Sequence, residues 1–300
     1  MIYKSGAFLA LLATLIWGMY PLFYAPLSNF SAIDVLVARI ITSVCFLYVT
    51  ITVGKSFSLS EVKTILQSKE SRSTIVLSAL ITLVWWLVYI YAVTNELILE
   101  ASLGYFISPI ISVLFGILVF QERIRLFGKI SISLMIIGVG YLVWQYGQVP
   151  YAAIMIGICF SLYAVVRKGK TIKPIEGLMG ECLILLPVSI LIVAYRVVDG
   201  TFSISSINFD IVTLALLSTG ALSVLPLLWY GMAASKLSLI SLSFFQFIPP
   251  ICNLLFAVFI FHEDFTQHHI ITFGFIWAAL AAYLVEKFIP QQTKELIHVK

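Results

Sequence analysis

The sequence predicts an all-α polytopic membrane protein with ten transmembrane helices, arranged as two inverted repeats of five helices each. Three observations lead to this prediction: a very apolar composition, ten long apolar stretches, and motifs that recur in the two halves of the chain. Of the 300 residues, 61% are hydrophobic and 11% are charged, and the mean hydropathy is +1.06. Soluble domains are about 45–50% apolar and about 25% charged. The composition therefore excludes a soluble domain, a disordered chain, a coiled coil and a nucleic-acid binder.

Ten apolar stretches are each long enough to cross a bilayer, which takes about 20 residues of α-helix. They cover residues 5–26, 33–53, 74–94, 99–120, 127–146, 149–166, 177–195, 211–232, 238–261 and 268–289. The first is expected to be a retained span, because Trp17, Gly18 and Pro21 near its end do not resemble a signal-peptide cleavage site.

Lysines and arginines predict the orientation, since cytoplasmic loops carry an excess of them. With the N-terminus inside, all but two of the 18 fall in segments on that side; Arg196 is alone outside, and Arg39 lies within a stretch. Both termini are therefore expected in the cytoplasm. The inside segment 54–73 contains Ser58 and Glu61 at capping-box spacing, followed by apolar residues at helical period. This pattern predicts a short helix at the membrane interface.

The second half of the chain repeats the first. A shift of 141 residues aligns Ser102 with Ser243, Phe106 with Phe247, Pro109 with Pro250 and Glu122 with Glu263, and a shift of 142 aligns Ile33, Asp34 and Leu36 with Ile175, Glu176 and Leu178. The expected units are a first repeat at 1–147, a second at 148–290 and a cytoplasmic tail at 291–300. Five spans is an odd number, so the second repeat starts on the opposite side of the membrane. Inverted repeats are typical of secondary transporters, whose binding site lies between the repeats near the midplane; the alternative is an old duplication in a protein that transports nothing.

Polar and proline residues follow one face of the stretch 238–261, and the repeat-equivalent positions of 99–120 are of the same kind. The two sets are Ser243, Gln246, Pro250 and Asn253, and Ser102, Tyr105, Pro109 and Ser112. Polar residues at membrane depth face protein or a water-filled cavity. Two interpretations stay open: the lining of a substrate cavity, or interhelical hydrogen bonds of about 0.6 kcal/mol each. Pro109 and Pro250 are expected to kink their helices.

Arg39 and Glu181 are the charged residues that lie deepest in the predicted spans. They occupy repeat-equivalent positions under the 142-residue shift, with opposite charges. An unpaired charge at the bilayer centre costs at least about 2.5–3.5 kcal/mol, so each needs a partner. The sequence suggests that the two pair and recognise a polar group of a substrate, with Glu181 as the candidate proton carrier. The alternative is a structural pair, or two side chains that reach the nearer interface.

Several motifs resemble RarD proteins, of the EamA branch of the drug/metabolite transporter superfamily, over essentially the whole chain. They are Glu100-Ala-Ser-Leu-Gly-Tyr-Phe-Ile-Ser-Pro109, Ile16-Trp17-Gly18 with Pro21, Val166-Arg167-Lys168, Glu181 with Leu186-Pro187, Phe244-Phe245-Gln246 with Pro250, and Phe273 to Ala281. The resemblance implies an exporter-like permease of the bacterial inner membrane, in a family associated with chloramphenicol sensitivity. It makes Trp17 and Tyr105 the favoured aromatic residues of a pocket. One departure is Ala38, which precedes Arg39 where the family has histidine, so a proton role for that histidine does not transfer.

The sequence thus favours a multi-pass secondary transporter of small metabolites or drugs over other classes of membrane protein. It contains no nucleotide-binding loop, and it lacks the paired residues that a membrane-embedded enzyme would use for catalysis. His262, His268 and His269 lie outside the apolar cores and there is no CxxC pair, so neither a metal nor another cofactor is expected. A channel-like facilitator is the main alternative, and an enzyme a weaker one. The expected partners are a small-molecule substrate and the lipid bilayer, without nucleic acid; monomer and homodimer both stay open.

Overall fold

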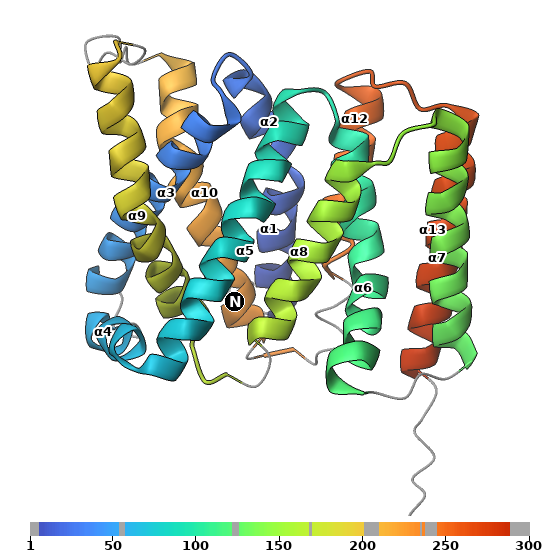
Figure 1. The fold of residues 1–300 in the computed structure, drawn as a ribbon, viewed down its shortest axis with the longest axis horizontal. Helices are drawn as coiled ribbons and strands as arrows, with labels where there is room; N and C mark the ends of the chain where they lie inside the picture. Colours follow the sequence, from blue (N-terminus) through green and yellow to red (C-terminus); the bar gives the residue numbers. More distant parts are fainter. Residues whose placement is uncertain are drawn as a thin grey trace, which may run out of the picture.

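The computed structural model describes residues 6–53, 58–121, 126–167, 170–200, 210–234, 236–237 and 245–288, and within these ranges all regular structure is helical. The helices are α1 (Gly6–Gly18), α2 (Tyr20–Tyr24), the 3-10 turn η2 (Ala25–Leu27), α3 (Ala32–Val53), α4 (Leu59–Gln67), α5 (Lys69–Thr94), α6 (Ile98–Phe120), α7 (Leu126–Tyr146), α8 (Tyr151–Arg167), α9 (Pro174–Val198), α10 (Ile211–Ala234), α12 (Ile248–Phe259) and α13 (Gln267–Phe288). Figure 1 shows the long helices side by side in one bundle, with α4 lying across its lower end.

The chain is a polytopic membrane protein by the length and apolar character of its helices. Among the described residues, α3, α5, α7, α9, α10 and α13 are each long and apolar enough to cross a membrane, and two bent pairs raise the number to eight. The helices α8 and α12 are apolar but shorter. Each of the ten predicted stretches contains a helix. Large apolar side chains cover the outer surface, such as Leu191 at 68% exposure and Leu214 at 67%, as expected of a surface in contact with lipid.

The first predicted span is broken rather than continuous. The helix α1 ends at Gly18, and the axis turns by 44° into the segment Tyr20–Leu27. Pro21 lies in the first turn of α2, where the missing N–H of a proline costs no helical hydrogen bond. The break therefore follows from the glycine and proline that the sequence places here.

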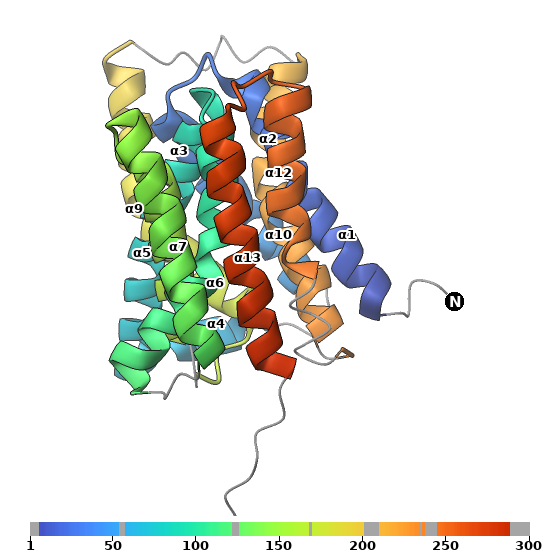
Figure 2. The same cartoon turned by 90° about the vertical axis from the view of Figure 1, so that its right-hand side faces the viewer.

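Helix contacts recur in pairs across the two halves of the chain. In the first half α1 packs on α10 and α12, and correspondingly α8 packs on α5 and α6. The contact of α3 with α10 likewise has a counterpart in that of α5 with α9. The pairs α3–α9, α6–α12 and α7–α13 each join one helix to its counterpart in the other half, and Figure 2 shows α7 and α13 side by side along one face.

Close helix approach depends on small residues at two crossings. A Cβ atom added at Gly104 of α6 would lie 2.8 Å from the carbonyl oxygen of Ala153 in α8, and one added at Gly220 of α10 would overlap the α3 backbone at Thr42 and Ser43. Membrane helices associate largely through such van der Waals contact, because lipid offers no hydrophobic driving force between them. Glycine at these positions therefore lets the backbones of α3 and α10, and of α6 and α8, meet directly.

The predicted interfacial helix is present as α4. Ser58 is its N-cap, and the Ser58 Oγ accepts a hydrogen bond from the Ser60 N–H at 3.2 Å. Glu61 does not complete a capping box: its carboxylate instead accepts from Lys173 Nζ at 2.7 Å. This bond raises the pKa of Lys173 above its ordinary value. The helix α4 is thus tied to the segment that precedes α9.

Glu263, in the connection between α12 and α13, caps a helix of the other half. Its two carboxylate oxygens accept from the backbone N–H groups of Ile98 and Leu99, the first turn of α6, at 2.7 and 2.8 Å. Burial raises the pKa of Glu263 above its ordinary value, while these two bonds oppose that rise. A carboxylate at a helix N-terminus satisfies free N–H groups and interacts favourably with the helix dipole.

Candidate functional site

Arg39 lies in the middle of α3, enclosed by aromatic side chains. The residue is 4% exposed. Its guanidinium carbon lies 3.9 Å from the ring centroid of Trp86 on α5, 5.6 Å from that of Tyr20 and 5.7 Å from that of Tyr24, both on α2. A desolvated cation over an aromatic face gains about 2 kcal/mol or more. We call these four residues the Arg39 cluster.

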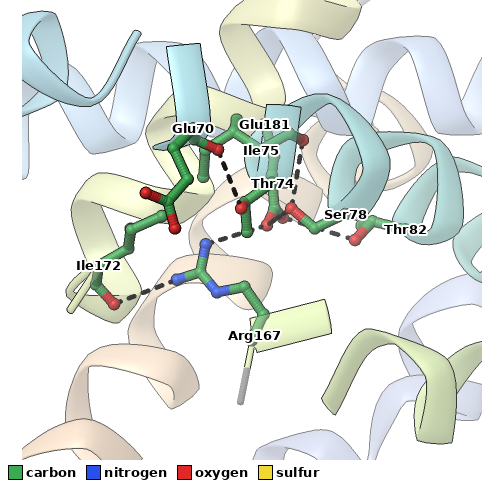
Figure 3. A network of polar contacts seen from close by, with 8 residues as sticks. All are labelled: Glu70, Thr74, Ile75, Ser78, Thr82, Arg167, Ile172 and Glu181. Atoms are coloured by element: carbon green, nitrogen blue, oxygen red, sulfur yellow. Dashed lines mark hydrogen bonds and ion pairs between the residues drawn. The ribbon is translucent and has the colours of Figure 1, made fainter. Parts of the chain in front are cut away.

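Glu181 lies on α9 in a second group of polar side chains, shown in Figure 3. Its carboxylate is 1% exposed and accepts hydrogen bonds from Ser78 at 2.7 Å and from Thr82 at 3.4 Å, both on α5. Arg167, the last residue of α8, places its Nη1 3.5 Å from Glu181 Oε1. The guanidinium also donates to the carbonyl oxygen of Ile172 at 3.4 Å. We call Glu181, Arg167, Ser78 and Thr82 the Glu181 cluster.

The direct pairing of Arg39 with Glu181 suggested by the sequence does not occur in the structure. Glu181 is paired with Arg167, and no carboxylate among the described residues forms an ion pair with Arg39. The reason is that Arg167, the last residue of α8, occupies this place instead. Its guanidinium lies over Gly177, one turn before Glu181 on α9. A Cβ at Gly177 would collide with this guanidinium, so the glycine provides the space for the pair.

Aromatic rings connect the Arg39 cluster to the Glu181 cluster. Tyr89 lies 6.2 Å from Tyr20 and 5.8 Å from Tyr105 between ring centroids. Tyr105 of α6 accepts a hydrogen bond from Trp85 Nε1 at 3.1 Å. The Trp85 ring is in turn 6.3 Å from that of Tyr163, which lies 5.9 Å from the guanidinium carbon of Arg167. The candidate site is therefore one continuous set of aromatic and charged side chains from α2, α3, α5, α6, α8 and α9.

Two of the predicted serines form hydrogen bonds between helices. Ser102 Oγ donates to the Pro250 carbonyl oxygen at 2.8 Å, which joins α6 to α12. Ser112 Oγ lies within hydrogen-bond distance of the Ser108 carbonyl oxygen and of Ser161 Oγ, and the contact with Ser161 joins α6 to α8. These contacts fit the alternative of interhelical bonding for the two serines.

Asn253 differs from these serines. It is 1% exposed, and neither atom of its amide has a hydrogen-bond partner. A buried amide without a partner costs about 1–3 kcal/mol, and a bound polar group would remove this cost.

Trp17 and Gln246 form a separate group. The Trp17 ring lies 5.2 Å from that of Tyr230 on α10, and the exposed Gln246 donates to the Tyr230 hydroxyl at 2.6 Å. Among the described residues, no ring contact joins Trp17 to the Arg39 cluster. Ser243 lies outside the described residues.

The two predicted proline kinks differ in the structure. The helix α6 bends by 41° between Ile98–Ser108 and Ile110–Val119, on either side of Pro109. Pro250 lies in the first turn of α12, where a proline is accommodated without a bend inside the helix.

Sequence reasoning missed the donors to Glu181. Ser78 and Thr82 stand four residues apart along an apolar stretch, the same signal that pointed to the stripes on the other two helices. In the sequence Arg167 is a cytoplasmic positive charge and part of a family motif, and neither feature indicates that it pairs with Glu181. Among the described residues, no group of three or more His, Cys, Asp or Glu side chains is placed to hold a metal ion.

Comparisons with known proteins agree on one family. Residues 4–144 match the EamA-like transporter family. The chain is 33% identical to "Protein RarD" of Salmonella typhi, over 97% of this chain and 98% of the relative, and 32% identical to "Protein RarD" of Escherichia coli K12, over 96% and 97%. An uncharacterized transporter of Bacillus subtilis, YojE, is 31% identical over 93% of each chain. A crystal structure with 18% identity covers 95% of this chain and 99% of its own, with a TM-score of 0.58, which shows a shared fold.

Proposed function

The chain belongs to the RarD-like branch of the EamA transporter family, and from this premise we propose that it is a secondary transporter that carries a small metabolite or drug across the bacterial inner membrane. In this proposal transport proceeds by alternating access, with two inverted five-helix repeats at 1–147 and 148–290 exchanging roles. The tail at 291–300 and the N-terminus lie in the cytoplasm, and the chain crosses the membrane ten times.

The contact pattern supports the inverted repeats. The most extensive contacts between the halves have a counterpart when each helix is replaced by its repeat equivalent, as for α1–α10 and α5–α8. The charge distribution supports the orientation. The helix α4 and the ends of α6, α8 and α13 lie at one end of the bundle (Figure 1), and lysines and arginines are concentrated in the segments that adjoin this end.

The observation that carries the proposal is the pair of buried charges at repeat-equivalent positions of α3 and α9. Arg39 is 4% exposed and the Glu181 side chain 1%. Ionisable side chains at membrane depth are costly and mark substrate or ion pathways. The connecting aromatic residues come from both halves, since Tyr89 and Tyr105 precede residue 148 and Tyr163 follows it. This supports a site between the two repeats, as expected for a transporter of this architecture.

Counterflow in proteoliposomes tests the proposal. Candidate solutes come from a comparison of metabolites in spent medium of cells with and without the gene. Purified protein in vesicles preloaded with unlabelled solute should then accumulate labelled solute transiently and with saturation. The variant Arg39→Gln should lose this accumulation, whereas Arg72→Gln, which removes an exposed arginine of α5, should keep it. Flux that does not saturate and shows no counterflow would identify a channel-like facilitator instead.

Reporter fusions test the topology on which alternating access depends. A fusion after Gly147 should report the outside, and one after Lys170 the cytoplasm. The reverse pattern would contradict the inverted arrangement of the two repeats.

A further inference from the structure

The Arg39 cluster carries one positive charge that the described part of the protein does not balance. No described carboxylate pairs with Arg39, and its Nε atom is buried without a hydrogen-bond partner. The carboxylate of Glu181, its repeat equivalent, is already engaged by Arg167, Ser78 and Thr82. Stacking on Trp86 offsets part of the desolvation of the guanidinium but does not neutralise its charge.

Three unpartnered hydroxyls belong to the Arg39 cluster or to residues next to it in the structure or on α3. The hydroxyls of Tyr24 and Tyr89 are buried without a partner, and their rings lie 6.3 Å apart. Ser43 Oγ, one turn after Arg39 on the same helix, is also buried without a partner. A hydroxyl can donate to an acceptor, and a guanidinium can only donate. A ligand group that only accepts can therefore take hydrogen bonds from the guanidinium and from these hydroxyls alike.

On the basis of the proposed transport function, we infer that the Arg39 cluster binds the carboxylate of a monoanionic substrate, whose apolar part packs on the surrounding aromatic rings. An ionised carboxylate is an acceptor-only group, and it takes two parallel N–H bonds from an arginine. Charge decides between anions. One arginine neutralises one negative charge, so a phosphate monoester or a dicarboxylate would leave a buried negative charge, which is strongly unfavourable in a low-dielectric interior. A cationic ligand would meet the guanidinium directly and is disfavoured for the same reason.

The experiment measures binding apart from transport. Full-length protein in lipid nanodiscs is titrated with benzoate, phenylacetate and 3-phenylpropionate, with the primary amide of each, and with phenyl phosphate and benzylammonium. Tryptophan fluorescence is the readout, because Trp86 stacks on the guanidinium. At least one carboxylate should bind about tenfold or more tightly than its amide, as expected for a charge-assisted pair, and tighter than the dianion and the cation.

Variants of Arg39 assign the preference to this side chain. Arg39→Gln should abolish the difference between carboxylate and amide, Arg39→Lys should keep part of it, and Arg72→Gln should keep it in full. If Arg39→Gln fails to fold, Arg39→Lys and the charge selectivity of the wild type still decide. Amides that bind as well as carboxylates, a preference that survives Arg39→Gln, or no binding by any of the three carboxylates would overturn the inference.

Counterflow of the bound carboxylate separates the two proposals. Carboxylate binding through Arg39 without counterflow would support the anion site and contradict transport of that anion. Saturable counterflow only of neutral or cationic solutes would leave the transport function standing and overturn the anion site.

Discussion

We expect the loss of Arg167 to destabilise the protein more than the loss of its partner Glu181. Arg167→Gln and Glu181→Gln each remove one member of the pair, and the double variant removes both. Arg167→Gln should be the more damaging single change, because it leaves the Glu181 carboxylate at 1% exposure with only Ser78 and Thr82 as donors. Glu181→Gln leaves Arg167, which is 13% exposed and still donates to the Ile172 carbonyl oxygen.

The geometry sets the magnitude. At 3.5 Å between Nη1 and Oε1, two unit charges attract by about 5 kcal/mol at an effective dielectric constant of about 20. Desolvation of both groups offsets much of this attraction, so the pair itself contributes little net stability. Removing one partner is different, since the other charge stays buried; this typically costs about 3–5 kcal/mol. We expect a loss near that range for Arg167→Gln and about 1–3 kcal/mol for Glu181→Gln.

Thermal melts of the four proteins in detergent test this reasoning. The double variant should be more stable than the sum of the two losses predicts, with a coupling of about 1–3 kcal/mol. Glu61→Gln and Lys173→Gln provide a matched control. That pair is shorter, at 2.7 Å, but its side chains are 44% and 52% exposed, so its coupling should stay below about 1 kcal/mol. Additive losses at Arg167 and Glu181, or a larger loss for Glu181→Gln than for Arg167→Gln, would refute the assignment of a buried pair.

Three further changes test single features of the fold by thermal melting. Glu176→Leu should raise the melting temperature, because both oxygens of this fully buried carboxylate lack a partner and that cost, about 1–3 kcal/mol, exceeds a helix-dipole gain of about 0.3–1 kcal/mol; a lower melting temperature would indicate a partner in the native state. Gly104→Ala should destabilise the α6–α8 contact, since its Cβ would lie 2.8 Å from a backbone oxygen, whereas Gly140→Ala, with nothing within 4 Å, should not; equal effects would argue against close packing. Glu263→Ala should cost about 1–2 kcal/mol by freeing the two N–H groups of α6, and Glu263→Gln less. The pKa of Glu263 is raised in the folded state. The contribution of the Glu263 carboxyl group to stability should therefore decrease as pH rises from the ordinary carboxyl pKa through the pKa of the folded state. If the melting temperature of Glu263→Gln has the same pH dependence as that of the wild type, this reasoning is wrong.

Long apolar stretches predicted where the helices lie, because each long hydrophobic run must form its backbone hydrogen bonds internally in lipid. The capping serine Ser58 correctly predicted the start of α4. Breaks within spans were less predictable. Pro109 lies at a bend inside α6, whereas Pro21 and Pro250 each fall in the first turn of a helix, and a proline in the sequence does not say which of these positions it occupies. The match to RarD proteins agrees with the family resemblance read from the motifs.

Side-chain partners between helices were the least predictable feature, and the two deep charges show why. The repeat related Arg39 to Glu181 and gave their depth along α3 and α9, but depth leaves open which neighbouring helix offers a partner. Arg167 reaches Glu181 because Gly177 leaves room for its guanidinium, a lateral relation that no spacing within one helix encodes. Arg39, without a carboxylate, stacks on Trp86 instead. The two halves therefore use these two positions for different chemistry: in the second half the charge of Glu181 is paired with Arg167, and in the first half Arg39 has no carboxylate partner among the described residues.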